Sequence, residues 1–197
     1  MTTDTSKPAL RRAILGVVNS MSPSERALSS ERARALLAAQ SLWRDARSVL
    51  LYAPMAGELD VWPLLDPALA AGKTVGLPRF DSKAGVYLAC QVRDPLQDIR
   101  TGHYGIREPA AHCAEFLLNR LDLILVPGVA FDLQGRRLGR GKGYYDQLLA
   151  VLRGVTCGVA FDQQIVDAIP VVAHDVQVNC ILTPTRWRSC GRRTVLE

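Results

Sequence analysis

Short, continuous apolar runs recur along the chain, separated by stretches with helical periodicity. A run that is apolar at every position predicts a strand covered on both faces of a sheet, rather than a strand with one face in water. The predicted strands are residues 48–53, 74–77, 86–92, 123–126, 155–161 and 178–182. The predicted helices are residues 23–43, 64–71, 145–152 and 163–168. Strands and helices therefore alternate, which favours a mostly parallel central sheet flanked by helices on both faces.

The N-terminal forty residues favour helices and carry a start signal. Ser22, Pro23 and Glu25 form a capping-box pattern with proline at the first helical position. No internal repeat, low-complexity segment or linker divides the 197 residues. The predicted fold class is a single α/β domain over residues 1–197, with an N-terminal helical segment and a basic C-terminal tail from about residue 186.

Composition narrows the class of protein. Hydrophobic residues make up 48% of the chain, yet no apolar run approaches the ~18–20 residues that span a membrane. Asp4 and the lack of a small-residue cleavage site argue against a secretory signal, so we expect a cytoplasmic protein. The five cysteines form no C-x-x-C pair, which indicates neither a zinc site nor a disulfide framework.

The net charge of +5 raises the question of a nucleic-acid partner. The cationic residues are scattered, apart from one cluster at residues 136–142 and another at residues 186–193. Aromatic residues are not interleaved with them as in an RNA-recognition motif. We therefore expect small anionic ligands and no specific nucleic acid. A basic nucleic-acid-binding module that uses residues 186–193 stays open as an alternative.

Residues 123–149 hold the strongest chemical signal in the chain. An apolar run leads into a Pro-Gly break, then into a glycine-rich turn with four cations, and then into a helical stripe. Glycines let the backbone approach an anion, and backbone N–H groups together with a lysine bind phosphate. The four cations are Arg136, Arg137, Arg140 and Lys142. This combination is typical of a site for a nucleoside triphosphate.

The turn matches neither of two common phosphate-binding motifs. A P-loop has a glycine five residues before its Gly-Lys pair and a Ser or Thr after it, but Arg136 and Gly143 stand there. A dinucleotide fingerprint would need glycine where Tyr144 stands. A basic surface hairpin without a ligand is the alternative interpretation of this segment.

Asp146 lies at the start of the predicted helix that follows the turn. A carboxylate there is favoured by the helix dipole, so helix stability alone is one explanation for it. Beside a phosphate-binding turn it also suits Mg²⁺, which takes one or two carboxylates together with substrate phosphates. We interpret Asp146 as a magnesium ligand because of these neighbours.

Two further loops are placed where ligands gather in α/β proteins, beyond the ends of strands. Glu58 lies in the loop after the strand at residues 48–53, and a solvated or helix-capping acid is the alternative role for it. The loop at residues 102–106 is rich in turn residues that let a chain surround a ligand. Both are therefore candidate ligand-binding loops.

Five blocks of residues, spread over nearly the whole chain, follow one family pattern. The longest is residues 126–146, which contains the sequence RLGRGKGYYD. The others are residues 7–11 (KPALR), 57–60 (GELD), 105–109 (GIREP) and 174–176 (HDV). Together they resemble the 5-formyltetrahydrofolate cyclo-ligase family, also called 5,10-methenyltetrahydrofolate synthetases. The resemblance implies a single α/β domain with a central sheet.

The resemblance also implies a reaction, in which 5-formyltetrahydrofolate and MgATP give 5,10-methenyltetrahydrofolate, ADP and phosphate. The formyl oxygen would be phosphorylated and N10 would then attack the formyl carbon. Mg²⁺ would be the cofactor and ATP a co-substrate, and we expect a monomer with no membrane partner. The main alternative is a divergent member that binds ATP or folate without this turnover. Another is an enzyme on the same scaffold that acts on a different N-formyl or amide substrate.

Individual roles follow from the same resemblance. The residues implied as catalytic are Lys142, Arg140 and Tyr144. The residues implied to bind ATP are Lys7, Arg11, Arg137, Gly139, Arg140, Gly141, Lys142, Gly143, Tyr144 and Tyr145. Those implied to bind the folate substrate are Ala53, Glu58, Tyr104, Arg140, Gly141, Lys142, Gly143 and Tyr144. The implied metal ligands are Asp146 and Asp175.

Overall fold

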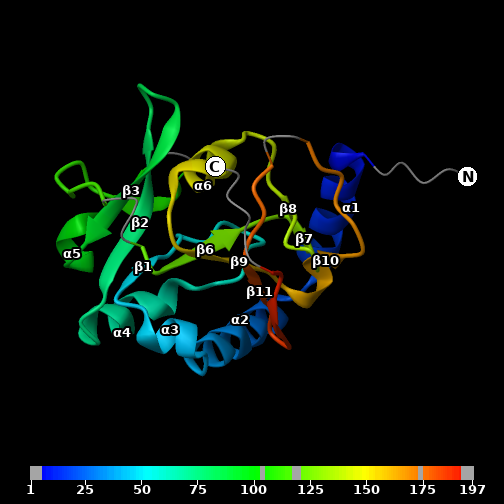
Figure 1. The fold of residues 1–197 in the computed structure, drawn as a ribbon, viewed down its shortest axis with the longest axis horizontal. Coiled ribbons are helices and arrows are strands. Elements are labelled where there is room, and N and C mark those ends of the chain that lie inside the picture. Colours follow the sequence, from blue (N-terminus) through cyan, green and yellow to red (C-terminus); the bar gives the residue numbers. More distant parts are fainter. Residues whose placement is uncertain (1–5, 103–104, 117–120, 173–174, 192–197) are drawn as a thin grey trace, which may run out of the picture.

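The computed structural model describes residues 6–102, 105–116, 121–172 and 175–191 of the chain. A seven-stranded sheet crosses its centre, with the strand order β12-β11-β9-β6-β1-β2-β3 (Figure 1). Its strands are β1 (Ser48–Leu50), β2 (Thr74–Asp81), β3 (Val86–Val92), β6 (Leu123–Pro127), β9 (Val155–Val159), β11 (Cys180–Leu182) and β12 (Trp187–Ser189). The five inner strands run parallel, and β3 and β12 add antiparallel edges. The predicted mostly parallel sheet is therefore confirmed.

Apolar side chains fill both faces of this sheet, which is why its central strands are apolar at every position. In β1, Val49 joins one core cluster and Leu50 the other. In β6, Leu125 and Ile124 divide in the same way, and all four side chains are fully buried. One cluster packs against the N-terminal helices and the other against the helix after the glycine-rich turn. Helices thus cover both faces, as predicted.

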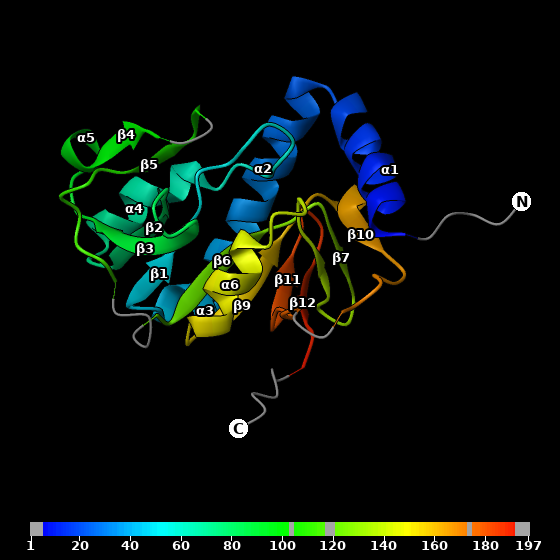
Figure 2. The ribbon, with the colours of Figure 1, turned by 90° about the horizontal axis from the view of Figure 1, so that it is seen from above.

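Except for α5, the α-helices lie in regions predicted to be helical, with different ends. They are α1 (Lys7–Ser20), α2 (Pro23–Ala38), α3 (Ser41–Asp45), α4 (Leu65–Ala70), α5 (Pro95–Asp98) and α6 (Tyr144–Val151), with 3₁₀ turns η1 (Trp62–Leu64) and η4 (Asp162–Gln164). The capping box is present, because the Glu25 N–H donates to Ser22 Oγ and the Ser22 N–H donates to Glu25 Oε2. α1 lies beside the 3₁₀ turn η4 at one end of the molecule (Figure 2).

The prediction of one continuous helix up to Trp43 is wrong. α2 ends at Ala38, Gln40 is extended, and a separate short helix α3 follows. On a continuous helix Trp43 would lie about 120° around the axis from Leu37, away from the core. The break lets both side chains enter the same core cluster.

Several strand ends also differ from the predictions. β1 ends at Leu50 rather than at residue 53, although the Leu51 N–H still donates to the Gly76 carbonyl. β2 continues to Asp81 and pairs with β3 as a long antiparallel hairpin. The strands expected at residues 155–161 and 178–182 are shorter, and the structure has Val155–Val159 and Cys180–Leu182.

The prediction of a short helix at residues 163–168 is wrong. The chain makes the single 3₁₀ turn η4 and then the strand β10 (Ile165–Val166), which pairs in parallel with β7 (Ala130–Asp132). Gln164 fixes this geometry, because its amide donates to the carbonyls of Gly128 and Val129. It also accepts a hydrogen bond from the Phe161 N–H, so a tertiary contact overrides the local helical pattern.

Two small sheets that the sequence did not indicate shape the molecule around the site. β7 and β8 (Arg137–Leu138) form a hairpin that leads into the glycine-rich turn, in a sheet of order β10-β7-β8. The stretch between residues 93 and 115, for which no helix or strand was predicted, holds α5 and a second hairpin. Its strands are β4 (Ile99–Thr101) and β5 (Arg107–Pro109).

The C-terminal region differs from the expected basic tail. Trp187–Ser189 forms strand β12, which pairs with β11 at the edge of the main sheet, so the first part of the predicted tail belongs to the fold. Residues 192–197 lie outside the described residues. Among the residues that the structure describes, no helix is both long and apolar enough to cross a membrane.

Candidate active site

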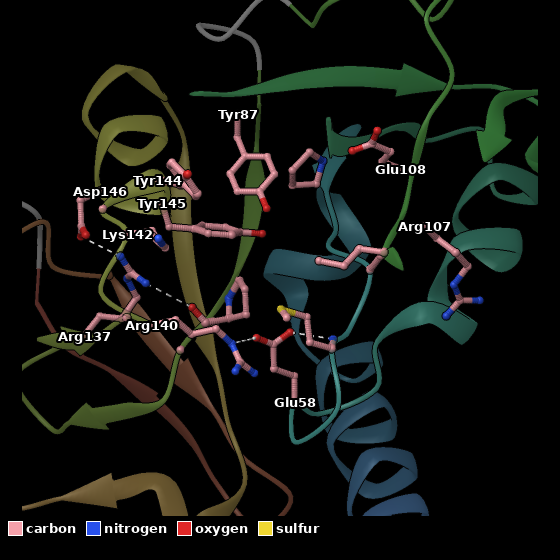
Figure 3. A pocket seen from close by; sticks show the side chains of 18 residues that line it. Glu58, Tyr87, Arg107, Glu108, Arg137, Arg140, Lys142, Tyr144, Tyr145 and Asp146 are labelled. Atoms are coloured by element: carbon pink, nitrogen blue, oxygen red, sulfur yellow. Dashed lines mark hydrogen bonds and ion pairs between the residues drawn. The ribbon is translucent and has the colours of Figure 1, made fainter. Parts of the chain in front are cut away.

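A cavity of about 310 Å³ opens between the glycine-rich turn and the segments that face it (Figure 3). One wall consists of the turn and the start of α6. The opposite wall consists of the loop after β1, the β2–β3 hairpin and the start of β5. Ten of the residues predicted from the sequence line this cavity: Ala53, Glu58, Arg137, Gly139, Arg140, Lys142, Gly143, Tyr144, Tyr145 and Asp146. Tyr104 lies outside the described residues.

Four other predicted residues do not line this cavity: Lys7, Arg11, Gly141 and Asp175. Lys7 and Arg11 lie on α1. The Arg11 Nε donates to the Gly139 carbonyl at 2.7 Å, and its guanidinium lies beside Gly141. α1 therefore holds the turn from behind. Gly143 closes the turn with φ at 72°, a conformation that favours glycine, and is the N-cap of α6.

Arg137 and Asp146 form an ion pair at the base of the cavity. The Arg137 Nη2 donates to Asp146 Oδ1 at 2.7 Å, and the arginine side chain is only 4% exposed. The Arg137 Nε has no hydrogen-bond partner among the described residues. Asp146 Oδ2 likewise has none among them, so this carboxylate keeps an oxygen that fits a hard cation such as Mg²⁺.

Asp175, the second predicted metal ligand, lines a different cavity of about 240 Å³. Its Oδ2 pairs with the Lys7 ammonium at 2.5 Å and accepts the Val172 N–H. Arg137 lines both cavities and so stands between them. In this structure the two predicted metal ligands are thus in neighbouring cavities, and each is paired with a cation.

Glu58 reaches the same cavity from the loop after β1. Its side chain is 9% exposed, and its two oxygens accept hydrogen bonds from the Met55 N–H and from Arg140 Nε at 2.9 and 3.2 Å. The Arg140 contact joins the loop after β1 to the glycine-rich turn, 82 residues further along the chain. The carboxylate therefore fixes the position of Arg140 and also faces the cavity.

An aromatic wall lines the cavity beside these charged groups. Tyr87 from β3 lies with its ring centroid 5.6 Å from that of Tyr144 and 5.8 Å from that of Tyr145, and Phe80 packs behind them. Desolvation, and to a lesser degree the Glu58 charge, raises the pKa of the Tyr145 hydroxyl well above its usual value. The phenol stays protonated at neutral pH and remains able to donate a hydrogen bond.

Glu108 also lines the cavity, although the sequence suggested no role for it beyond its place in the GIREP block. It is 6% exposed, and it accepts the Phe80 N–H at 3.2 Å and lies 3.5 Å from Arg100 Nη2. The carboxylate approaches Gly102 so closely that a Cβ there would lie 1.9 Å from the Glu108 Cδ. Figure 3 shows this carboxylate across the cavity from Asp146.

Sequence reasoning missed Tyr87 and Glu108 for different reasons. Tyr87 lies in an apolar run, where an aromatic residue is usually core, so no local signal separated it from its neighbours. Glu108 did carry a signal, because an acid between Arg107 and Pro109 in a glycine-bounded loop is unusual for a solvated face. Both lie on segments that only the β2–β3 and β4–β5 hairpins bring to the cavity.

The fold and this cavity define an α/β protein with a basic glycine-rich turn beside a mostly parallel sheet. The family model described as the 5-formyltetrahydrofolate cyclo-ligase family matches residues 3–184 of the chain. The chain therefore belongs to the 5-formyltetrahydrofolate cyclo-ligase family, and it is a ligase of that family.

Individual relatives agree with this assignment. The 5-formyltetrahydrofolate cyclo-ligase of Mycolicibacterium smegmatis is 35% identical over 194 residues, covering 92% of this chain and 95% of that protein. The Escherichia coli (strain K12) cyclo-ligase is 33% identical over 145 residues, covering 72% of this chain and 80% of that protein. The solved structure of Aquifex aeolicus 5,10-methenyltetrahydrofolate synthetase is similar with a TM-score of 0.84 and 34% identity, covering 97% of this chain and 96% of that one.

Proposed function

We propose that the protein cyclises 5-formyltetrahydrofolate to 5,10-methenyltetrahydrofolate and converts ATP to ADP and phosphate. The observation that carries this proposal is the composition of the larger cavity. A basic glycine-rich turn with Lys142 faces an aromatic wall and two carboxylates, Glu58 and Glu108, within one space of about 310 Å³. Such a cavity suits a substrate that is flat and rich in N–H donors, next to a phosphate donor.

The chemistry explains why such a cavity would need a phosphate donor. The formyl oxygen of the substrate is a poor leaving group, so ring closure by N10 stalls. Transfer of the γ-phosphoryl group breaks the bond between that phosphorus and ADP, and forms a new bond to the formyl oxygen. N10 then bonds to the formyl carbon and loses its proton, and the carbon–oxygen bond breaks to release inorganic phosphate. In such a reaction, positioning of the reactants and neutralisation of the phosphate charge supply most of the rate acceleration.

The nucleotide fits the side of the turn that faces α1. Arg137 lies between the two cavities, and Asp175 and the Lys7 ammonium lie in and beside the smaller one. We place the triphosphate along this side and the transferring group beside Lys142 and Arg140. Gly139, Gly141 and Gly143 let the backbone come close to the phosphates. Tyr144 and Tyr145 follow the turn directly, and the resemblance implies that they also bind ATP. In this arrangement they would contact the nucleotide beside the turn.

Asp146 is the residue best suited to hold Mg²⁺, because one of its oxygens has no partner among the described residues. Asp175 is a second candidate, although its Oδ2 already pairs with Lys7 and accepts the Val172 N–H. When bound, Mg²⁺ supplies positive charge that neutralises the phosphate oxygens. Arg137 has the same electrostatic effect from its buried position, whether or not the metal is present.

The folate fits against the opposite wall. The pterin ring is flat and carries several N–H groups, so its face suits Tyr87 on this wall and Tyr144 at the end of the turn, and its edge suits the carboxylates of Glu58 and Glu108. Ala53 lines the same side without a bulky side chain. In this arrangement the formyl group points towards Lys142, Arg140 and Tyr144, the three residues that we propose as catalytic.

Near-UV absorbance of the purified protein with 5-formyltetrahydrofolate tests the proposal directly. The methenyl product has a chromophore that the substrate lacks, so its band should grow only when both ATP and Mg²⁺ are present. Omitting either one gives the control. If ATP and folate bind but no band grows, the proposal is wrong and a divergent member without turnover is favoured.

A further inference from the structure

Three side chains with metal-ligating atoms meet beside α5 and the β4–β5 hairpin, at the opposite end of the molecule from α1 (Figure 2). They are Asp98, His112 and Cys113, which we call the Asp-His-Cys cluster. Each contributes one donor atom, and the three donor atoms lie within 4.8 Å of one another. Within the described part of the chain, no other three such side chains come as close together. None of the three lines either of the two cavities, so the cluster is separate from the proposed active site.

The contacts in the cluster bring a carboxylate oxygen, an imidazole nitrogen and a thiol together. His112 Nε2 lies 2.9 Å from Asp98 Oδ1, and the Cys113 thiol donates to the Asp98 carbonyl at 3.6 Å. The other carboxylate oxygen is fixed, because Asp98 Oδ2 accepts the Arg93 and Asp94 N–H groups at 2.7 and 3.0 Å. Oδ1 is therefore the oxygen that is held towards the imidazole.

Backbone hydrogen bonds hold the two parts of the cluster against each other. The Ala110 N–H donates to the Asp98 carbonyl at 2.7 Å, and the Cys113 N–H donates to the Ala110 carbonyl at 3.0 Å. From β2, Arg79 Nη1 donates to the carbonyls of Ala110 and Cys113 at 3.0 and 3.2 Å. These bonds do not use the three donor atoms, so the donor atoms are positioned before any ligand binds. Cys113 is buried, whereas the His112 side chain is 62% exposed, so the cluster is open to solvent on the imidazole side.

The donor atoms select the class of cation. Mg²⁺ prefers oxygen ligands alone, whereas thiolate, imidazole and carboxylate together suit Zn²⁺. In a tetrahedral site with bonds of about 2.0–2.3 Å, neighbouring donor atoms are roughly 3.3–3.6 Å apart. The imidazole and the carboxylate would therefore separate by a few tenths of an ångström, a movement that the exposed His112 ring can make. Coordination releases the Cys113 thiol proton to solvent and needs His112 Nε2 without its proton.

We propose that the Asp-His-Cys cluster binds Zn²⁺ through Asp98 Oδ1, His112 Nε2 and Cys113 Sγ, with water in the fourth position. The ligands flank residues 99–111, which contain the β4–β5 hairpin and Glu108. A bound ion would tie the two ends of this segment together and so stabilise the cavity wall to which Glu108 belongs. The site does not depend on the proposed function, because its ligands lie outside the cavities.

Titration of the full-length protein with Zn²⁺ alone tests this site, after a chelator has removed bound metal and without nucleotide or folate. Calorimetry should find one site from which an excess of Mg²⁺ does not displace Zn²⁺. Co²⁺ in place of Zn²⁺ should give a thiolate-to-cobalt charge-transfer band, which reports coordination by a cysteine. His112→Ala and Cys113→Ser should each raise the Kd for Zn²⁺ about tenfold or more, and Cys113→Ser should remove the cobalt band. His112 is exposed, so its variant should fold even if the variant of the buried cysteine does not.

A second thiol provides the matched control. Cys190 is only partly buried, and Cys190→Ser should leave both the Kd for Zn²⁺ and the cobalt band unchanged. Zn²⁺ should also raise the Tm of the wild type and have no such effect on His112→Ala. Asp98 is left in place in this test, because its Oδ2 supports the backbone and its loss would disturb the fold as well.

Three results would overturn the site. One is a wild type that gives no thiolate-to-cobalt band, and another is loss of that band in Cys190→Ser. The third is a weakening of Zn²⁺ binding by Asp146→Asn as large as that by His112→Ala, because the cation would then occupy the active site.

Discussion

The two walls of the larger cavity are built in different ways. The wall that carries Arg137, Lys142 and Asp146 comes from one continuous stretch of ten residues, shaped by glycines and fixed by an ion pair within that stretch. The opposite wall comes from the loop after β1, the β2–β3 hairpin and the start of β5. Its parts meet only through contacts between distant segments, such as the hydrogen bond from the Phe80 N–H to Glu108.

This difference suggests a division of roles, in which one wall would serve phosphate chemistry and the other would select the organic substrate. The continuous wall presents cations and backbone N–H groups, a combination that suits phosphate whatever the organic substrate is. The assembled wall presents the Tyr87 ring, Glu58 and Glu108, which suit one flat molecule with N–H donors at its edge. Substitutions in the first wall should therefore lower kcat, and substitutions in the second should act on folate binding or on stability.

The largest effect is expected for Lys142→Ala in the continuous wall. The side chain is exposed and makes no ion pair among the described residues, so the fold should stay intact. Loss of its charge from the transferring phosphoryl group should lower kcat by roughly 10²- to 10³-fold. The rate of growth of the methenyl band measures this loss. Lys83→Ala, at the tip of the β2–β3 hairpin, is the matched control, and wild-type turnover in the Lys142 variant would refute the role.

Asp146→Asn should have the next largest effect, because it removes a charge from both the metal and Arg137. The Mg²⁺ concentration needed for half-maximal rate should rise by about tenfold or more. The nearly buried Arg137 would also lose its charged partner, at a cost of about 1–3 kcal/mol in the free energy of unfolding. Mg²⁺ titration of the rate and urea unfolding measure the two effects separately.

Asp175→Asn is the comparison for this variant. If Asp175 is also a ligand, its variant should shift the Mg²⁺ titration in the same direction. If it serves only to hold Lys7, the titration should stay unchanged while stability falls slightly. An unchanged titration for Asp146→Asn would exclude Asp146 as a metal ligand.

The same contrast between the walls explains what the sequence could predict. The glycines, cations and Asp146 of the continuous wall lie within one segment, so their chemistry is visible as a motif. The hydrogen bond between Arg11 and the Gly139 carbonyl joins residues 128 apart, and the residues alone did not indicate it. The pairing of Arg137 with Asp146 was equally hidden, since both were interpreted as ligands of the nucleotide or its metal.

The fold could be predicted from the sequence where burial sets the pattern of apolar residues. The prediction failed where side-chain hydrogen bonds or strand pairing override that pattern. The central strands are apolar on both faces, so their approximate positions could be predicted from the apolar runs, and their parallel direction from the alternation with helices. Gln164 lies within a predicted helix, but its side-chain amide donates hydrogen bonds to two backbone carbonyls, and a strand follows instead. Trp187 lies in an arginine-rich stretch that resembled a tail, whereas pairing with β11 makes it part of an edge strand.

Glu58→Gln tests the assembled wall at its contact with the continuous one. Loss of the charge should raise the KM for folate about three- to tenfold and affect ATP less, because in the proposed arrangement the carboxylate contacts the pterin. The amide keeps an oxygen that can still accept from the Met55 N–H, so the loop should persist. KM values for both substrates measure the split. Equal losses for the two would mean that Glu58 acts by holding Arg140.

The smallest effect is expected for Asp98→Ala, which should change stability and leave catalysis almost untouched. Asp98 ends α5 and supports the β4–β5 hairpin that carries Arg107 and Glu108. Hydrogen bonds from the Arg93 and Asp94 N–H groups, and then the contact with His112, lower its pKa to about 2. The substitution should cost about 1–2 kcal/mol in the free energy of unfolding at neutral pH.

The sign of this shift fixes the pH range in which the cost of Asp98→Ala should disappear. The folded-state pKa lies below the ordinary value of 3.8, so the ionised carboxylate stabilises the fold fully only above about pH 4. That contribution is lost as the pH falls from about 4 to about 2, and the difference between wild type and variant should close over the same range. Urea unfolding at pH 7, 4 and 3 measures it, with the exposed Asp45→Ala as control. A difference that stays constant down to pH 3 would show that packing, and not the ionised carboxylate, stabilises this end of the assembled wall.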